Sequence, residues 1–319
     1  MKLYLSAAAA LAVALLLSGT ALAKGHRSHG HPAALAKGHR SHGHPTTVSL
    51  YERDARPFRL ARQGCSAARR GESGVVVLDF GKPAFGGLRH GGYGTIDFSN
   101  RFISNHQITM GMLGWARGYF HCLPRHSQKL VTLARGTSNY HPHVPRVSRA
   151  GRRWAGAVIA LGRRLRRHGL NTHVRSAAAD DAEPAWDRDF RNTRRFIHGF
   201  REFGHGRTLY NYGSLDGGVG AIWSARQMMY VVGGKGNTAV LPEIYYSSQA
   251  EQWAELAHIA HQWFHRSIHF AGVMTQGSPS CHCGYRPPAA HWALARALAR
   301  VDTGRRIHVP NRGTNIVSG

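Results

Sequence analysis

The chain has 319 residues, enough for one large α/β domain or two ordinary ones, and its 42% hydrophobic content excludes a wholly disordered protein. It carries 42 Lys and Arg against 16 Asp and Glu, a formal net charge of +26. This excess favours an anionic partner, which by charge alone is a nucleic acid, a cell wall or a membrane surface. A solvated arginine-rich surface without a specific partner explains the charge equally well.

Residues 1–23 have the pattern of a secretory signal peptide. Lys2 supplies a positive start, residues 7–17 form an apolar run too short to span a bilayer, and residues 21–23 fit a small-residue cleavage site. We therefore expect a secreted protein, extracellular or associated with the cell wall. No later segment approaches the ~20 apolar residues of a membrane helix, so we expect no stable membrane insertion after cleavage. An uncleaved N-terminal anchor is the alternative.

A histidine-rich tandem repeat follows, because residues 21–32 recur as residues 34–45. Its polar composition predicts a disordered segment over 24–45, and a duplication without a role is the favoured interpretation. Cleavage after residue 23 or after residue 36 would leave His26 or His39 third from a free amino terminus. The amine, two backbone amides and the imidazole then form a square-planar set that suits Cu(II) or Ni(II). Apart from this metal candidate, we expect no required cofactor.

Strand-like and helix-like patterns alternate through the body of the chain, after a linker or capping segment at 46–70. Apolar runs that end in turn residues predict strands at 74–80, 129–135, 171–179, 208–212, 228–232, 239–245 and 268–276. Apolar residues at helical spacing predict helices at about 103–118, 147–169, 188–204, 248–266 and 289–301.

This alternation implies parallel strands joined by helical crossovers. We expect an α/β fold with a (β/α)8-type barrel over residues 71–310, incomplete or irregular, and a tail at 311–319. About seven strands are recognisable against eight in a closed barrel, and the missing strand would lie in 91–98, 119–123 or 306–309. An open doubly wound sheet is the alternative, although no GxGxxG follows the first strand.

Polar side chains gather at the carboxyl ends of the predicted strands, where barrel enzymes place their active sites. The set contains Asp79, Arg135, Asn139, Asp180, Asp181, Glu183, Asn211, Tyr212, Asp216, Glu243, Tyr245 and Gln276. Six of the 16 acidic residues fall within it, which in so basic a chain predicts a functional site. The alternative is that these acids pair with arginines or cap helices, and Asp216, in a glycine-rich turn, fits that structural role.

Asp181 and Glu183 are two residues apart, so on an extended strand both side chains point to the same side. Glycoside hydrolysis needs two carboxyl groups at one bond, one that protonates the leaving oxygen and one that acts ionised as nucleophile or base. Aromatic residues lie near the same strand ends, namely Tyr140, Trp186, Tyr212 and Tyr245. Their faces would stack on sugar rings, although packing is the commoner role of any one of them.

The ending Val-Val-Val-Leu-Asp79 and the pair Asp181-Ala-Glu183 resemble secreted bacterial glycoside-hydrolase-like TIM barrels, including the lysozyme-like and chitinase-like groups. Those families place an Asp at the end of the first strand and Asp-x-Glu at the end of a central one. The resemblance implies that Glu183 is the general acid, Asp181 its partner and Asp79 a further carboxylate, with Glu243 as the opposing nucleophile or base. Residues 176–179 are neutral, so the full chitinase pattern and its substrate-assisted mechanism are not implied.

The same resemblance implies a polysaccharide partner, and the charge favours an anionic cell-wall glycan such as peptidoglycan, bound by a monomer. The residues expected to bind it are Asp180, Arg135, Asn139, Tyr140, Trp186, Asn211, Tyr212, Tyr245 and Gln276. A non-catalytic glycan- or wall-binding barrel is the first alternative, and a secreted metal-binding protein acting through its His-rich tail is the second. No nucleic-acid module, Walker loop, Gly-x-Ser-x-Gly elbow or HExxH helix occurs, so we expect no specific nucleic-acid partner.

The four cysteines, Cys65, Cys122, Cys281 and Cys283, favour disulfides in a secreted protein. A bond between Cys281 and Cys283 would close a small strained ring. We therefore expect at least one of them to pair with Cys65 or Cys122, and the three possible pairings stay open. A complete zinc set with ordinary ligand spacing is missing.

Overall fold

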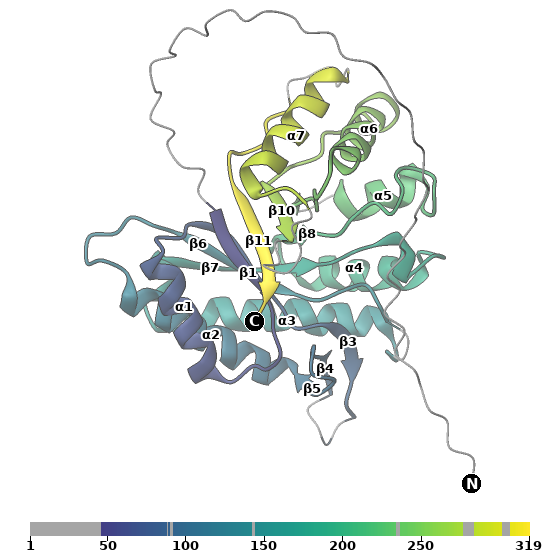
Figure 1. Cartoon of the computed structure of the whole chain (residues 1–319). Coiled ribbons are helices and arrows are strands. Elements are labelled where there is room, and N and C mark those ends of the chain that lie inside the picture. Colours follow the sequence, from purple (N-terminus) through teal and green to yellow (C-terminus); the bar gives the residue numbers. More distant parts are fainter. Residues whose placement is uncertain are drawn as a thin grey trace, which may run out of the picture. The chain divides into compact units, whose positions relative to one another are not determined.

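The computed structural model describes residues 46–87, 89, 92–141, 144–233, 237–276, 284–301 and 307–319. The chain divides into two units, Met1–Ser41 and His42–Gly319, and every described residue belongs to the second. In this part of the chain a curled sheet of eight parallel strands packs against seven α-helices (Figure 1). The predicted α/β fold with parallel strands is therefore confirmed.

The strands of the main sheet are β1 (Thr46–Tyr51), β2 (Gly74–Asp79), β6 (Val131–Gly136), β7 (Val174–Asp180), β8 (Leu209–Asn211), β9 (Thr238–Val240), β10 (Val273–Gln276) and β11 (Gly313–Ser318). The helices are α1 (Pro57–Arg69), α2 (Asn105–Cys122), α3 (Val147–Arg167), α4 (Arg191–Phe203), α5 (Ala225–Val232), α6 (Ser247–Phe264) and α7 (Pro287–Arg300). In chain order, one of these helices comes between each main-sheet strand and the next, from β1 to β11.

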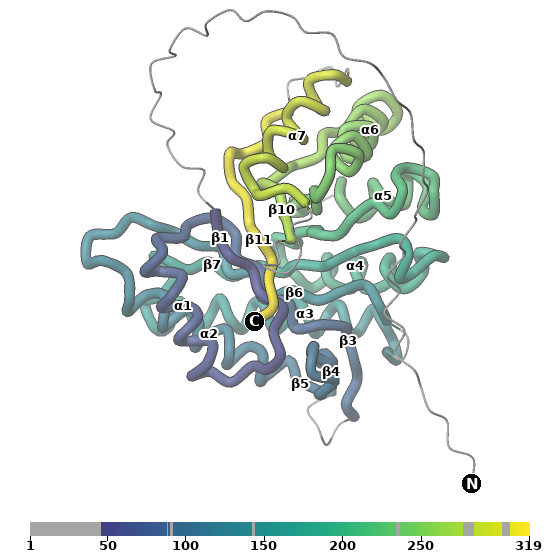
Figure 2. The backbone as a smooth tube through the Cα atoms, in the orientation of Figure 1, coloured from purple at the N-terminus to yellow at the C-terminus, as the bar shows by residue number. Residues whose placement is uncertain are grey.

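The spatial order of the strands follows the sequence, from β1 through β2, β6, β7 and β8 to β9, while β10 and β11 lie on the other side of β1. The two edges are linked by isolated parallel bridges, Val240 to Phe270 and Glu243 to Met274. The Ile244 N–H also donates to the Met274 carbonyl at 3.0 Å. The sheet is therefore barrel-like, and its curl can be followed in the backbone trace (Figure 2).

Two parts of the sheet were expected to be something else. The supposed linker at 46–70 contains β1 and α1, and the supposed tail at 311–319 contains β11. β1 and β11 pair with each other, and the Ser49 and Thr314 hydroxyls are 2.7 Å apart between them. Both strands carry buried Ser and Thr side chains, so neither shows the continuous apolar run that marks a buried strand in sequence. Their hydroxyls are satisfied by partners far away in sequence.

Residues 228–232, expected as a strand, belong to α5. The helix begins after Ser224, whose hydroxyl accepts from the Gln227 N–H while the Gln227 side chain accepts from the Ser224 N–H. This capping box fixes the first turn, so the apolar residues that follow it are helical. The predicted range 119–123 is also helical for the most part, because α2 extends to Cys122.

A small antiparallel sheet is inserted between β2 and α2. It consists of β3 (Lys82–Phe85), β4 (Tyr93–Ile96) and β5 (Phe102–Ser104), with β4 in the middle. The range 91–98, one of the places expected for a missing barrel strand, instead supplies β4 to this second sheet. Lys82 pairs with Ile96, which brings both to the edge where β2 ends.

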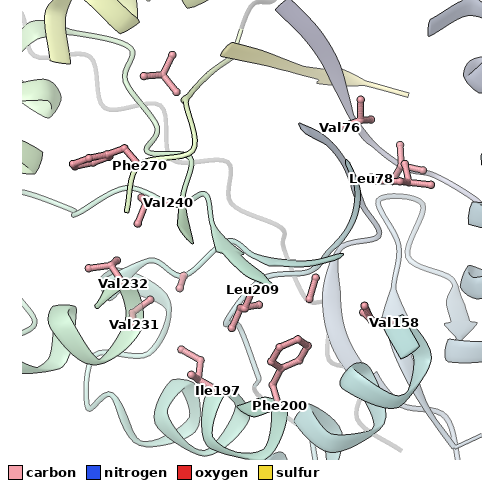
Figure 3. Packing of buried hydrophobic residues seen from close by; sticks show 14 of the residues in the cluster. Val76, Leu78, Val158, Ile197, Phe200, Leu209, Val231, Val232, Val240 and Phe270 are labelled. Carbon is pink, nitrogen blue, oxygen red and sulfur yellow. The ribbon is translucent and has the colours of Figure 1, made fainter. Parts of the chain in front are cut away.

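The core has two layers, separated by the main sheet. Val76 and Leu78 of β2 are fully buried and face the helices, with residues such as Val158 and Phe200 on the helical side (Figure 3). The alternate residue Val77 faces the inside of the curl with a second cluster, which contains Ala134, Ala177, Ala179, Tyr210, Tyr212, Ala239, Leu241, Met274 and Ile316. Since side chains alternate along a strand, this pattern also decides which polar residues at the strand ends face inward.

Helices α1 and α2 pack with almost no space between their backbones. A Cβ on Gly118 would lie 1.9 Å from the Ala61 carbonyl oxygen, and a Cβ on Gly64 would lie 2.0 Å from the Trp115 carbonyl oxygen. This close approach places Cys65 beside Cys122, which form a disulfide. The expected pairing of Cys65 or Cys122 with Cys281 or Cys283 is therefore wrong, because neighbouring helices bring the first two together.

Several predictions concern residues outside the described ranges. They are the signal peptide at 1–23, the repeat at 24–45 with its metal candidates His26 and His39, and Cys281 and Cys283. In the part of the chain that is described, no helix is long and apolar enough to cross a bilayer.

Candidate functional site

A cavity of about 880 Å³ opens at the carboxyl ends of the parallel strands, the position of active sites in α/β barrels. The ends of β1, β2, β10 and β11, the segments after β6, β7 and β9, and one end of the small sheet form its walls. The lining residues are Tyr51, Arg53, Asp79, Gly81, Lys82, Ile96, Asp97, Phe98, Asn100, Ser138, Tyr140, Asp181, Glu183, Trp186, Glu243, Tyr245, Gln276 and Ser318.

Four of the predicted carboxylates, Asp79, Asp181, Glu183 and Glu243, line this one cavity. The ion pairs formed within the described residues involve other acids, namely Asp54, Glu72, Asp97, Asp189, Glu202 and Glu251. The four cavity carboxylates are thus not tied up in pairs with arginines there, which was the structural alternative. An acidic cluster of this kind costs free energy, because burial and like charge both oppose ionisation.

Asp79 ends β2 and faces the inside of the curl. Its Oδ1 accepts from the Gly81 N–H at 2.8 Å, while burial raises its pKa to about 7. The Tyr212 hydroxyl lies within hydrogen-bonding reach of the Asp79 carboxyl and also contacts the Thr137 carbonyl at 3.3 Å. A hydroxyl has one proton, so when Tyr212 donates to Thr137 its oxygen accepts from a protonated Asp79.

Asp181 follows β7 and keeps the extended backbone, since it forms a parallel bridge with Ser138. Its carboxyl group is buried, and its Oδ1 has no hydrogen-bond partner among the described residues. Burial raises the pKa of Asp181 well above its usual range, and the charges of Glu243 and Glu183 raise it further. Asp181 is therefore favoured in its protonated form while its neighbours are ionised.

Glu183 is only partly buried and is connected through Ser214 to Asp216. Burial and the Asp216 charge raise the pKa of Glu183, while hydrogen bonds from Ser214 lower it. The Ser214 hydroxyl lies 2.7 Å from Asp216 Oδ1, and Asp216 Oδ2 accepts from the Ala185 N–H at 2.7 Å. The Ser214 hydroxyl therefore lies between the two carboxyl groups, and its one proton can serve only one of them at a time.

Glu243 follows β9 and is paired with a phenol. Burial raises its pKa to about 8, the Glu183 charge adds to this, and a hydrogen bond from Tyr245 lowers it. The pKa values of Tyr245 and Tyr51 are both raised well above their usual range by burial and by the surrounding carboxylates. Both phenols thus remain protonated donors at neutral pH.

Two predicted substrate-binding residues instead hold the loop that carries Glu183. Asn139 donates to the Glu183 carbonyl at 2.8 Å and accepts from the Glu183 N–H at 3.1 Å. Asn211 Oδ1 accepts from the N–H groups of Ala182 and Gly213, both at 3.3 Å. Neither Asn139 nor Asn211 lines the cavity, so the expectation of direct substrate contact is corrected to a positioning role.

Two further predicted residues lie on the other side of the sheet. The Arg135 guanidinium stacks on the Trp154 ring at 3.9 Å and donates to the carbonyl of Asn105. Asp180 is buried, and neither of its carboxyl oxygens has a hydrogen-bond partner in the described structure. Both residues alternate with inward-facing neighbours, Ala134 and Asp181, so they face the helices and not the cavity.

Aromatic side chains form part of the cavity wall. Tyr140, Trp186 and Tyr245 were predicted, as was the polar Gln276, and all four line the cavity. Tyr212 is fully buried beneath it, against Asp79. A further aromatic pair lines the cavity that was not predicted, Tyr51 and Phe98, whose ring centroids are 5.0 Å apart. Tyr51 was missed because β1 was taken for a linker.

No family model, curated protein or solved structure matches this chain. Across the described ranges, no group of three or more His, Cys, Asp or Glu side chains is placed to hold a metal ion. The chemistry of the cavity is therefore inferred from its own residues.

Proposed function

We propose that this chain is a secreted glycoside hydrolase that acts on a cell-wall or other polysaccharide by carboxylate general acid/base catalysis. The observation that carries the proposal is the convergence of Asp181, Glu183 and Glu243 on one open cavity in which they form no ion pair within the described residues. We also propose that the fold is an irregular (β/α)8-type barrel, supported by the strand order and by the bridges between the two sheet edges.

Glu183 is proposed as the general acid. It is the least buried of the three carboxylates, and burial together with the Asp216 charge raises its pKa, against the opposite effect of the hydrogen bonds from Ser214. In a glycoside hydrolase the acid donates its proton to the oxygen of the leaving sugar as the bond to the anomeric carbon breaks. A raised pKa extends to higher pH the range in which the acid keeps that proton.

Glu243 is proposed as the opposing nucleophile or base. It follows β9, whereas Glu183 follows β7, so the two approach the cavity from different strands. The Tyr245 hydrogen bond favours ionised Glu243, which either attacks the anomeric carbon or takes a proton from the attacking water. Asp181 is proposed to stay protonated, because burial and the charges of Glu243 and Glu183 all raise its pKa.

The rest of the cavity suits a carbohydrate. Its volume of about 880 Å³ lies in the range of small-ligand sites, and both aromatic and polar residues line it. Tyr140 and Trp186 are 42% and 39% exposed, which leaves ring surface on which a sugar can stack, although the Lys82 ammonium lies over the Tyr140 ring at 5.6 Å. The net charge of +26 adds attraction for an anionic wall glycan.

The test is turbidity loss and reducing-sugar release on purified cell walls and a panel of soluble glycans. Wild type, Glu183→Gln and Glu243→Gln would be assayed together, with folding checked by circular dichroism. Loss of about 10³-fold in kcat in both variants supports the proposal. Unchanged activity in both variants contradicts the roles assigned to these carboxylates.

A non-catalytic glycan-binding barrel is the second candidate. It is favoured by the raised pKa values of Asp79, Asp181, Glu183 and Glu243, because a hydrolase needs one of them ionised at its working pH. Under this alternative, wild type sediments with cell walls but releases no sugar from any substrate. Glu183→Gln then changes only retention on the walls.

A further inference from the structure

A second large cavity lies along α3, away from the carboxylates. Its volume is about 1100 Å³, and five of its lining residues are arginines while none is acidic. We call it the arginine groove; it is lined by Phe85, Gly92, Tyr93, Asn105, His106, Thr109, Pro145, Arg146, Arg149, Arg152, Arg153, Gly156, Ala157, Ala160, Arg164 and Phe203. None of these residues was predicted for the candidate site.

The groove follows from the spacing of large and small side chains on one helix face. Arg149 and Arg153 occupy successive turns, Ala157 and Ala160 occupy the next positions at helical spacing, and Arg164 follows one turn later. The small residues leave a hollow between guanidinium groups at either end. At a rise of ~1.5 Å per residue, Arg149 and Arg164 are about 22 Å apart along the axis. A linear ligand fits this shape better than a single small anion.

Most of these arginines are free to bind. Arg152 pairs with Glu202 at 2.7 Å. The guanidinium groups of Arg149, Arg153 and Arg164 form no ion pair or hydrogen bond with the described residues. Guanidinium groups hold carboxylates, sulfates and phosphates through paired N–H donors, and clusters of them concentrate anions.

Three Phe or Tyr residues line the groove, and Phe85 and Phe203 are 37% and 47% exposed. The Phe85 and Tyr93 ring centroids are 4.9 Å apart, and the Tyr93 hydroxyl donates to the Pro145 carbonyl at 2.9 Å. Exposed rings stack with the bases of single-stranded nucleic acids and also with sugars, so these rings suit either kind of ligand. A glycan is favoured because β3 links the groove to the cavity for which a polysaccharide is proposed.

We propose that the arginine groove binds a linear anionic glycan, one that carries carboxylate or sulfate groups along its length. Strand β3 connects this groove with the carboxylate cavity, because Lys82 lines the cavity and Phe85 lines the groove. At ~3.3 Å per residue these two positions are about 10 Å apart. The choice of a glycan rests on the proposed function, but binding in the groove uses none of Asp79, Asp181, Glu183 and Glu243, so the two proposals can fail separately.

The experiment compares two triple variants of the secreted protein that remove the same charge from the same helix. Arg149→Gln, Arg153→Gln and Arg164→Gln together remove three guanidinium groups that line the groove and form no ion pair with the described residues. Arg163→Gln, Arg166→Gln and Arg167→Gln together are the matched control, since these exposed arginines do not line the groove. Binding is measured by fluorescence anisotropy at ~0.1 M salt, with labelled polygalacturonate, a heparin fragment, neutral dextran and single-stranded DNA as probes.

The expected result is that the groove variant binds both anionic glycans at least about tenfold more weakly, and the control less than about threefold. Wild type does not bind dextran. A further variant, Ala157→Leu, fills the hollow without changing charge and is expected to weaken glycan binding as well. Thermal unfolding confirms that each variant is folded.

Three results would overturn the proposal. Equal weakening in the two triple variants would mean that anions bind the whole basic surface. Tighter, groove-dependent binding of DNA than of either glycan would identify a different class of ligand. Absence of binding by wild type to either anionic glycan would leave the arginines as a solvated face.

Discussion

Asp180 and Asp181 are neighbours in sequence but belong to different regions of the molecule. Asp181 faces the inside of the curled sheet and lines the cavity with three other carboxylates, whereas Asp180 faces the helices and lines no part of it. Arg135, on the next strand, shares the helix-facing side with Asp180. Residues at the carboxyl ends of the strands therefore face either the inside of the curl or the helices. The alternation of side chains along a strand decides which side each residue faces.

The two regions also differ in what opposes their charges. On the inner side, burial and the charges of neighbouring carboxylates raise the pKa values of Asp181 and Glu243. The repulsion between these carboxylates is therefore reduced by protonation and not by ion pairs with Lys or Arg in the described part of the chain. On the outer side, burial alone accounts for most of the shift, raising the pKa of Asp180 to about 8 and lowering that of Arg135 to about 9. The inner side gathers carboxyl groups that affect one another's ionisation, and the outer side contains isolated polar groups within the core.

The difference between the two sides is tested most directly by neutralising Asp180 and Asp181 in separate variants. We expect Asp181→Asn to lower kcat/KM on the polysaccharide substrate by about 10²-fold, because the inner cluster loses a titrating member. Asp180→Asn should change kcat/KM by less than about threefold. Equal losses in the two variants would show that the face of the strand does not decide function.

Removal of Arg135 tests the outer side through stability. Arg135→Ala deletes the stacking on Trp154 and the bonds to Asn105, and relief of desolvation offsets part of that loss. We expect a decrease of about 2 kcal/mol in the free energy of unfolding, measured by urea denaturation. The KM of the folded variant should be unchanged, and a large rise in KM would place Arg135 in the site after all.

The pH dependence of stability separates Asp180 from the inner cluster. The folded-state pKa of Asp180 is raised to about 8, so folded protein holds a proton that unfolded protein releases above about pH 4. Its contribution to stability is therefore lost as pH rises through that window, by up to about 1.4 kcal/mol per pH unit. Asp180→Asn should be increasingly more stable than wild type from pH 5 to pH 8.

The control for that measurement is Glu255→Gln on the exposed side of α6, which changes the same charge without burial. Thermal unfolding of the three proteins at each pH gives the comparison. A difference between Asp180→Asn and wild type that stays constant with pH would mean that Asp180 is ionised in the fold.

The smallest expected effect concerns Asp216. Its charge raises the pKa of Glu183, so Asp216→Asn should lower that pKa. Because a general acid must be protonated, the alkaline limb of the kcat/KM profile should move to lower pH by about one unit or less. Asp216→Glu, which keeps the charge, should restore most of the profile. A profile that does not move in Asp216→Asn would restrict Asp216 to its structural bond with the Ala185 N–H.

Much of the inner region could be predicted from sequence because its markers are local. The apolar run of β2 ends in Asp79, the run of β7 ends beside Asp181, and Glu183 lies two residues further on. Tyr51 could not be placed in the cavity, because β1 is a short strand with polar side chains. Ser214 was missed because only its contacts with Glu183 and Asp216 distinguish it from other loop serines.

Sequence alone determined the α/β alternation, the positions of the strongest strands and helices, and the gathering of acids at strand ends, because each depends on residues a few positions apart. Only the tertiary structure decided the partnership of β1 with β11, the disulfide between Cys65 and Cys122, and the faces of Asp180 and Arg135. The arginine groove belongs to the second group, since its far wall comes from β3, β4 and α4. These features depend on contacts between distant segments, which no local pattern encodes.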